Sequence, residues 1–140
     1  MSQDFGLSIK KIWEDDFLYE LKGNFKNQLI QVEVHFYSDD QSIKELIEGL
    51  TNFIEINGKE KSIWGSDDQV VKMVFLRQNQ AGRIIVELEL QNQLEGPEQV
   101  NAAFSIQTEF LDLERLVNKL KLFLEKNNTE FRAFPFQRDE

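Results

Sequence analysis

The sequence predicts an α+β fold: a two-layer sandwich in which an antiparallel sheet of about six to seven strands carries two helices packed on one face. Two segments, residues 39–57 and 108–126, have apolar residues at the spacing of a one-faced helix. The remaining segments alternate like strands, and the short turns between them favour antiparallel pairing. The chain has 140 residues, and we find no linker and no internal repeat in it. We therefore expect residues 1–140 to form one domain.

The first helical segment is the element around which we expect the core to form. Asp39 or Asp40 can cap its start, and Ser42 with Glu45 offers an alternative capping box. Asn57-Gly58 supplies the left-handed residue that commonly ends a helix. Because a helix with one apolar face must bury it, we expect a sheet beneath. The apolar face consists of Ile43, Leu46, Ile47, Leu50, Phe53 and Ile54.

Three strands precede this helix in the prediction. Residues 5–13 alternate loosely, and residues 17–22 form a second strand that ends in a turn at Gly23-Asn24. Residues 29–37 form the clearest strand, because polar and apolar residues alternate strictly. Its inward residues are Ile30, Val32, Val34 and Phe36, and its outward residues are Gln31, Glu33, His35 and Tyr37.

Four strands follow the helix. Residues 58–65 form a short strand, and residues 70–78 are apolar on both faces and are therefore placed in the centre of the sheet. Residues 83–92 and 99–108 follow, the first across a hairpin turn and the second after a loop. The inward residues of these two strands are Ile84, Val86, Leu88, Leu90, Val100, Ala102, Phe104 and Ile106.

The second helix begins after a cap at Thr108 and carries its own apolar stripe. The stripe consists of Leu113, Leu116, Val117, Leu120 and Leu124, widened by Phe110 and Phe123. Residues 127–140 contain Phe131, Phe134 and Phe136 among polar residues. This tail either packs as an extended segment against the sheet edge or is partly disordered.

The chain is acidic, with a formal net charge of −9, and it contains no cysteine. An acidic surface disfavours nucleic acid and anionic membranes and favours a basic partner, although acidity also serves solubility alone. The absence of cysteine fits a reducing compartment, and we find neither a signal peptide nor a membrane span. We expect a cytoplasmic protein.

Catalytic and cofactor signatures are missing from the sequence, so we expect a protein that is not an enzyme and binds no cofactor or metal. His35 is the only histidine, and the glycines form no phosphate-binding cluster. The acidic pairs Asp15-Asp16, Asp39-Asp40 and Asp67-Asp68 fall at expected turns or helix starts, where capping explains them without a metal.

The sheet face opposite the helices is the candidate partner-binding surface. We expect Glu33, His35, Tyr37, Glu87 and Glu89 to lie on this face and to meet a basic polypeptide. The alternative is a solvated face that binds nothing, which is common in antiparallel sheets with one covered side.

Several segments resemble the WapI-type immunity proteins of bacterial contact-dependent toxin systems. The helix LIEGLTNFIE precedes a hairpin with Gly82 before IIVELEL, and FSIQTEFLDLERLVNKL leads into the last helix. The similarity spans roughly residues 29–124, although Arg83 stands where the family often has histidine. The matching positions are Gly82, Ile84, Ile85, Val86 and Leu88 in the hairpin, and Phe104, Gln107, Thr108 and Leu111 before and within the last helix.

The resemblance implies an α+β fold and a non-catalytic protein that neutralises a cognate toxin by occluding its active surface. A basic toxin domain would suit the negative charge of this chain. The alternative is an assembly module that forms a homodimer or larger homo-oligomer through tail phenylalanines or an edge strand, without a toxin partner.

Overall fold

The structure is a computed structural model that describes residues 5–55, 60–66, 69–78, 83–92, 95–125 and 128–134. Its first half contains β1 (Gly6–Glu14), β2 (Tyr19–Lys26), β3 (Gln31–Ser38) and α1 (Asp40–Ile54). Its second half contains β4 (Lys61–Trp64), β5 (Val71–Arg77), β6 (Arg83–Gln91) and β7 (Asn101–Glu109). The chain then forms α2 (Phe110–Leu124) and a last strand, β8 (Glu130–Ala133). A single 3-10 turn, Gly96–Glu98, lies between β6 and β7.

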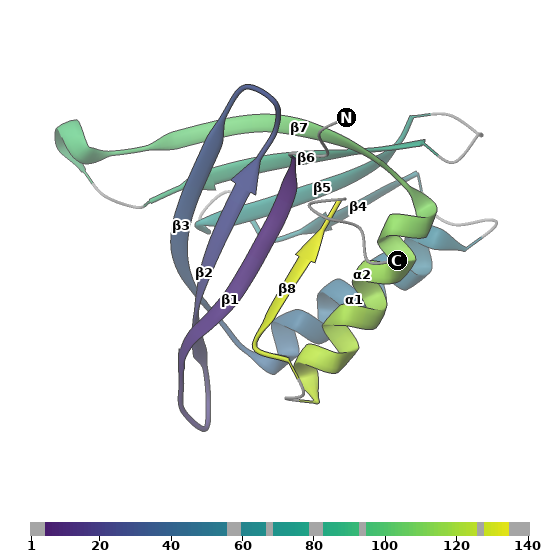
Figure 1. The fold of residues 1–140 in the computed structure, drawn as a ribbon, viewed down its shortest axis with the longest axis horizontal. Helices are drawn as coiled ribbons and strands as arrows, with labels where there is room; N and C mark the ends of the chain where they lie inside the picture. Colours follow the sequence, from purple (N-terminus) through teal and green to yellow (C-terminus); the bar gives the residue numbers. More distant parts are fainter. Residues whose placement is uncertain are drawn as a thin grey trace.

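The strands form two antiparallel four-stranded sheets (Figure 1). The first sheet has the order β3-β2-β1-β8, and the second has the order β4-β5-β6-β7. The α+β class and the antiparallel pairing are confirmed, but the prediction of one sheet of six to seven strands with both helices on one face is wrong. Alternation shows which side chains face inward, whereas it does not show which strands share hydrogen bonds. After α1 the chain pairs β4 with β5 and begins a new sheet.

Both sheets and both helices bury their apolar sides in one continuous core. The helices contact each other, α1 also contacts β4, and α2 also contacts β7 and β8. In Figure 1 the first sheet lies in front, the second behind and above it, and the helix pair at the lower right. The largest side chains that are almost fully buried are Phe25, Phe53, Phe75, Phe123 and Phe134.

The predicted start of the first helix is confirmed, because Asp39 caps it and its Oδ1 accepts a hydrogen bond from the Ser42 amide at 2.8 Å. At the other end the Arg77 guanidinium donates to the carbonyls of Phe53 and Glu55. The guanidinium also lies 5.1 Å from the Phe53 ring centroid. A side chain from β5 thus satisfies the end of α1, and Asn57-Gly58 lies outside the described residues.

The predicted cap of the second helix is wrong. Thr108 belongs to β7, is buried, and donates from Oγ1 to Asp112 Oδ2 at 2.9 Å. Glu109 occupies the N-cap position without a side-chain capping bond. The strand runs directly into the helix, so the hydroxyl of Thr108 satisfies a buried carboxylate on the first turn and not a backbone amide. Lys126, the expected end, lies outside the described residues.

The predicted turn at Gly23-Asn24 is also wrong, because β2 continues through it. A Cβ on Gly23 would lie 2.6 Å from Cε2 of Phe25, so the phenyl ring occupies the space of the missing side chain. Glycine here permits close packing inside a strand. The actual turn follows at Asn27, whose Oδ1 accepts bonds from the amides of Leu29 and Ile30.

Within the predicted tail, residues 130–133 form an edge strand. β8 pairs antiparallel with β1, with Ala133 opposite Leu7 and Glu130 opposite Lys10. Phe131 and Phe134 are buried, whereas Phe136 lies outside the described residues. Two of the three tail phenylalanines therefore belong to the core and are not available to a second molecule.

We found no internal repeat in the sequence, but the two halves of the structure repeat one topology. Each sheet begins with a strand of four residues, β8 or β4, continues through three longer strands and leads into a helix of fifteen residues. The four buried positions of α1 recur 70 residues later in α2. These pairs are Ile43 and Leu113, Leu46 and Leu116, Leu50 and Leu120, and Phe53 and Phe123. The first half takes its short strand from the end of the chain, as in a circularly permuted duplication.

Tyr19 places a polar group inside this core. Its ring packs edge-on against Phe123 at 5.7 Å between centroids, and the residue is only 4% exposed. Its hydroxyl has no hydrogen-bond partner among the described residues. Burial and, secondly, the nearby Asp40 carboxylate raise the pKa of Tyr19 above its ordinary value.

We predict that Leu50→Ala and Leu120→Ala each lower the free energy of unfolding by about 2–5 kcal/mol, because each removes a fully buried side chain from equivalent helix positions. Urea denaturation measures the change. The control is Leu111→Ala, at a position 52% exposed, for which we expect a change within about 0.5 kcal/mol. Near-native stability of either core variant would contradict the shared core.

We also predict that stability falls as the pH rises above about 10, and that Tyr19→Phe reduces this fall. The folded protein holds the phenol proton more tightly than the unfolded chain does. Its contribution to stability is therefore complete below the unfolded pKa and is lost as the pH rises above it. Urea midpoints at about pH 8 and about pH 11 test this. An identical loss in both proteins would show that other groups cause it.

Candidate functional site

The outer face of β2 and β3 gathers three of the five predicted partner-binding residues. Glu33, His35 and Tyr37 alternate along β3 with Val34 and Phe36, which are buried in the core. The strict alternation of this strand therefore produced the predicted facing. In the antiparallel register, Lys22 lies opposite His35 and Glu20 lies opposite Tyr37.

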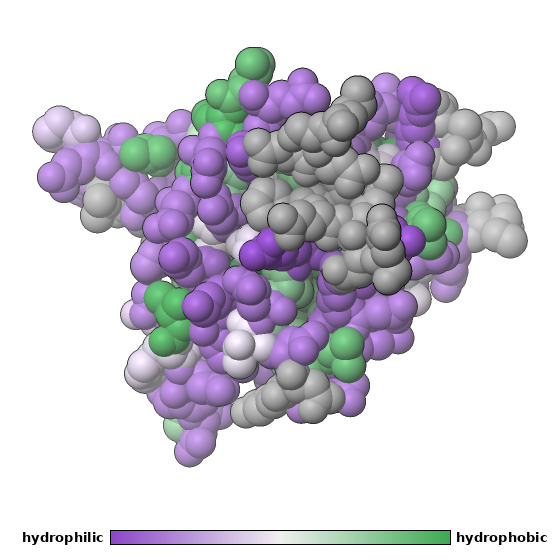
Figure 2. All heavy atoms as spheres, in the orientation of Figure 1, coloured by the Kyte–Doolittle hydropathy of each residue, from purple (hydrophilic) through white to green (hydrophobic). Residues whose placement is uncertain are grey.

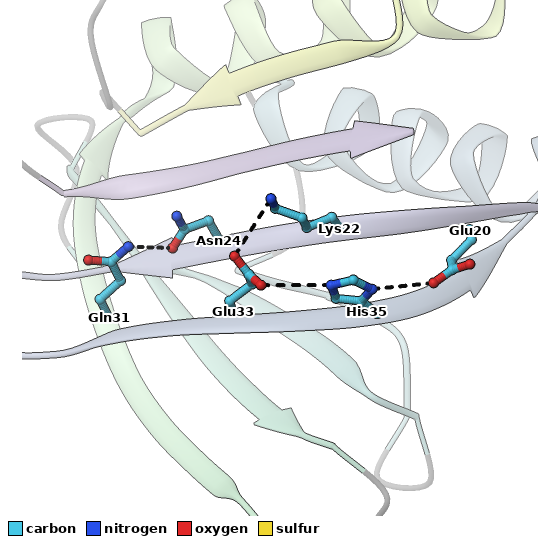
Figure 3. Close-up of polar contacts among 6 residues, drawn as sticks. All are labelled: Glu20, Lys22, Asn24, Gln31, Glu33 and His35. Carbon is cyan, nitrogen blue, oxygen red and sulfur yellow. Dashed lines mark hydrogen bonds and ion pairs between the residues drawn. The ribbon is translucent and has the colours of Figure 1, made fainter. Parts of the chain in front are cut away.

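These side chains form an ordered polar array (Figure 3). The Nδ1 atom of His35 lies 3.3 Å from Oε2 of Glu20, and its Nε2 atom lies 3.7 Å from Oε2 of Glu33. The other carboxylate oxygen of Glu33 lies 3.8 Å from Lys22 Nζ. Along the same strands the amide of Gln31 donates to Oδ1 of Asn24 at 3.0 Å. Neighbouring strands thus hold the array in place.

The side chains of the array are exposed and restrict one another's rotamers. The side chains of His35 and Glu33 are 50% and 51% exposed, so water screens their attraction and the pairs add little to stability. Their mutual contacts nevertheless limit the rotamers of the carboxylates, which reduces the entropy lost when a partner binds. Tyr37, 66% exposed, adds a rigid aromatic ring beside them.

A cleft of about 300 Å³ borders this face. It is lined by His35, Tyr37, Ser38 and, from the other half of the chain, Trp64 and Gln69. The indole Nε1 of Trp64 donates to the carbonyl of Ser42 at 3.0 Å, which fixes the wall of the cleft. The cleft therefore connects the array with residues of the second half of the chain.

Glu87 and Glu89 lie apart from the other predicted residues. Both point outward from β6, in the second sheet, and Glu89 Oε2 lies 3.6 Å from Lys72 Nζ. The prediction placed all five residues on one open face of one sheet. The structure instead divides them between the outer surfaces of two sheets, because β3 and β6 belong to different ladders.

Glu20 and Lys22 were not among the predicted site residues. They belong to β2. The predicted strand ended too early, at residue 22, and we predicted no inward or outward side for its residues. The alternation of buried Tyr19 and Leu21 with Glu20 and Lys22 is the signal that could have found them.

Another cleft, of about 570 Å³, lies between the β2–β3 turn and the strands β6 and β7. Arg83 and Glu109 line it, together with Asn27 and Leu29. Within the described residues, no group of three or more His, Asp and Glu side chains is arranged to hold a metal ion. In the same part of the chain, no helix is long and apolar enough to cross a membrane.

No protein-family model, curated protein or solved structure matches this chain significantly. The resemblance to WapI-type immunity proteins therefore stays a prediction. Function must be argued from the surface itself, from its charge, exposure and geometry.

We predict that Glu33→Gln combined with His35→Gln changes the free energy of unfolding by less than about 0.5 kcal/mol, because the array is exposed and weakly stabilising. Thermal or urea unfolding at neutral pH measures this. The comparison is Phe36→Ala on the same strand, which removes a buried ring and should cost about 3–5 kcal/mol. A large loss in the array variant would mean that these residues serve the fold.

Proposed function

We propose that this protein is a non-catalytic binding protein that neutralises a basic toxin domain by occluding its active surface, in the manner of WapI-type immunity proteins. The observation that carries the proposal is the polar array on the outer face of β2 and β3. There Glu20 and Glu33 flank His35 on a rigid sheet, and Tyr37 lies exposed beside them. Carboxylates held in fixed positions next to an exposed aromatic ring are typical of a surface that meets lysine and arginine side chains.

The charge of the whole chain supports the same kind of partner. A net charge of −9 on 140 residues attracts a basic domain over a distance and raises the association rate. It also disfavours nucleic acid, since phosphates would be repelled. An inhibitor of a basic nuclease-type toxin would need both properties.

A second candidate function is homo-oligomeric assembly, and one observation favours it. Figure 2 shows a hydrophobic cluster at the top of the molecule, over the β2–β3 turn. Leu29 is 95% exposed there and Ile30 is 39% exposed. Sedimentation of the isolated protein over a range of concentrations separates the two proposals. A dimer that Leu29→Ser weakens would favour assembly.

We predict that the array, and not the second sheet, governs partner association. The partner for the test is the product of the adjacent reading frame, where the proposal places a basic toxin domain, and the measurement is the association rate by stopped flow. Glu20→Lys with Glu33→Lys should lower the rate by about tenfold or more. Glu87→Lys with Glu89→Lys changes the net charge equally on the other sheet, so we expect a smaller, salt-sensitive decrease.

Equal decreases in the two double variants would show that the overall charge of the protein, and not the array, governs the association rate. If the adjacent domain neither binds the protein nor loses toxicity in its presence, the toxin-neutralising proposal fails.

A further inference from the structure

The end of the β1–β2 hairpin and the start of α1 enclose a second polar site, which is separate from the array. In Figure 1 this hairpin reaches the lower edge of the molecule, beside the point where β3 leads into α1. The pocket between them has a volume of about 270 Å³. It is lined by Glu14, Asp15, Asp16, Phe17, Leu18, Tyr19, Asp39, Asp40 and Gln41. Five of these nine residues are acidic and none is basic, so the pocket is strongly negative.

Backbone amides hold two of the carboxylates in place. Oδ1 of Asp15 accepts bonds from the amides of Phe17 and Leu18 at 2.8 and 2.9 Å, which lower the pKa of Asp15. Asp39 is held by the Ser42 amide as the cap of α1. Sequence analysis explained these acids as separate turn and cap residues. The fold brings the two pairs into one pocket.

Tyr19 gives the pocket a polar group that lacks a partner. The residue is 96% buried and lines the pocket, and its hydroxyl, which lies near the Asp40 carboxylate, makes no hydrogen bond of ordinary geometry among the described residues. A buried hydroxyl without a partner costs free energy, and a donor placed in the pocket would remove that cost. The phenol stays protonated at neutral pH, so its oxygen can accept a bond from a ligand and also donate one to a carboxylate.

The neighbouring Lys11 does not supply this donor to the pocket. Lys11 Nζ lies 4.7 Å from the centroid of the Tyr19 ring and 4.9 Å from that of Phe123, packed against the aromatic core. It pairs with Glu14 at 3.3 Å, and its side chain is only 5% exposed. Lys11 is therefore held beneath the pocket and does not line it.

The fold itself does not require acidic residues at this place. In the second half of the structure, Thr108 corresponds to Ser38 at the offset of 70 residues and pairs with Ile84, so Ile84 takes the place of Tyr19. That half also starts its helix without a capping carboxylate. The corresponding strand start and helix start are thus built without the buried tyrosine and without a side-chain capping bond.

We infer that this pocket receives an arginine side chain of a basic protein partner. The carboxylates are not arranged as a metal site among the described residues, so a larger cation whose charge is spread over several donors fits better. Phe17, 85% exposed, offers a ring on which a guanidinium can stack. Ile12 and Trp13, 42% and 49% exposed, precede the pocket residue Glu14 along β1. The inference rests on the proposed function and adds an anchoring contact to it.

The test uses a short peptide with one arginine, acetyl-Gly-Arg-Gly-amide, titrated into the full chain and followed by NMR. We expect shifts concentrated at residues 14–19 and 39–41, with a Kd in the millimolar range, which is about −4 kcal/mol. The same peptide with citrulline, which is neutral and of similar shape, should leave these signals unchanged. Shifts spread over the whole acidic surface, or equal shifts with citrulline, would overturn the inference.

Two variants and a matched control separate the pocket from general charge. Asp16→Asn with Asp40→Asn should weaken arginine-peptide binding by about tenfold, whereas Glu45→Gln with Glu48→Gln on the exposed side of α1 should not change it beyond about twofold. Tyr19→Phe keeps the net charge and the ring and should still weaken binding by about threefold. Equal effects of the two charge variants, or an unchanged affinity for Tyr19→Phe, would contradict the assigned site.

Failure of the arginine inference can be told apart from failure of the proposed function. If the adjacent toxin domain binds and is neutralised equally well by wild type and the Asp16→Asn, Asp40→Asn variant, only the arginine inference fails. If the arginine peptide binds at the pocket but the toxin domain does not bind the protein, the pocket stands and the toxin-neutralising proposal fails.

Discussion

Joint burial of two sheets and two helices is the interaction on which the rest of the structure depends. No strand of one sheet is hydrogen-bonded to a strand of the other. Packing of the buried side chains therefore holds the two sheets and the two helices together. Neither half buries its apolar side alone: α1 and α2 contact each other, and each also contacts a short edge strand. Phenylalanine fills much of this space, since seven of the twelve phenylalanines in the chain are buried there and three more pack against it.

Placing both helices in the common core leaves the outer surfaces of both sheets open. The array on β2 and β3 and the pocket at the β1–β2 hairpin are two features of this open surface, and both present carboxylates fixed by neighbouring strands or by backbone amides. The exposed ion pairs of the array contribute little to stability, whereas Asp39 and Asp15 also serve the fold as a helix cap and a turn residue.

Local patterns predicted the elements well and their assembly poorly. The alternation in β3 and the stripe in α1 gave the correct facing of Glu33, Val34 and Leu50, because side-chain periodicity follows from backbone geometry. Strand partners depend on contacts distant in sequence, so Glu87 was placed beside Glu33 although their strands lie in different sheets. The pocket around Tyr19 could not be foreseen for the same reason. A comparison of the two helices at a spacing of 70 residues would have revealed the repeat.

The position of β8 has a mechanical consequence. Because β1 and β8 are antiparallel, Leu7 at the beginning of one lies opposite Ala133 at the end of the other. A force that pulls residues 5 and 134 apart would therefore load the hydrogen bonds between these strands one at a time, as in opening a zipper, and would not shear them together. Under such a force β8 would detach first, at low load, and would expose the core beneath Phe131 and Phe134 before the two sheets separate. The resistance of this protein to unfolding under tension would thus be limited by one strand of four residues, however stable the core is at rest.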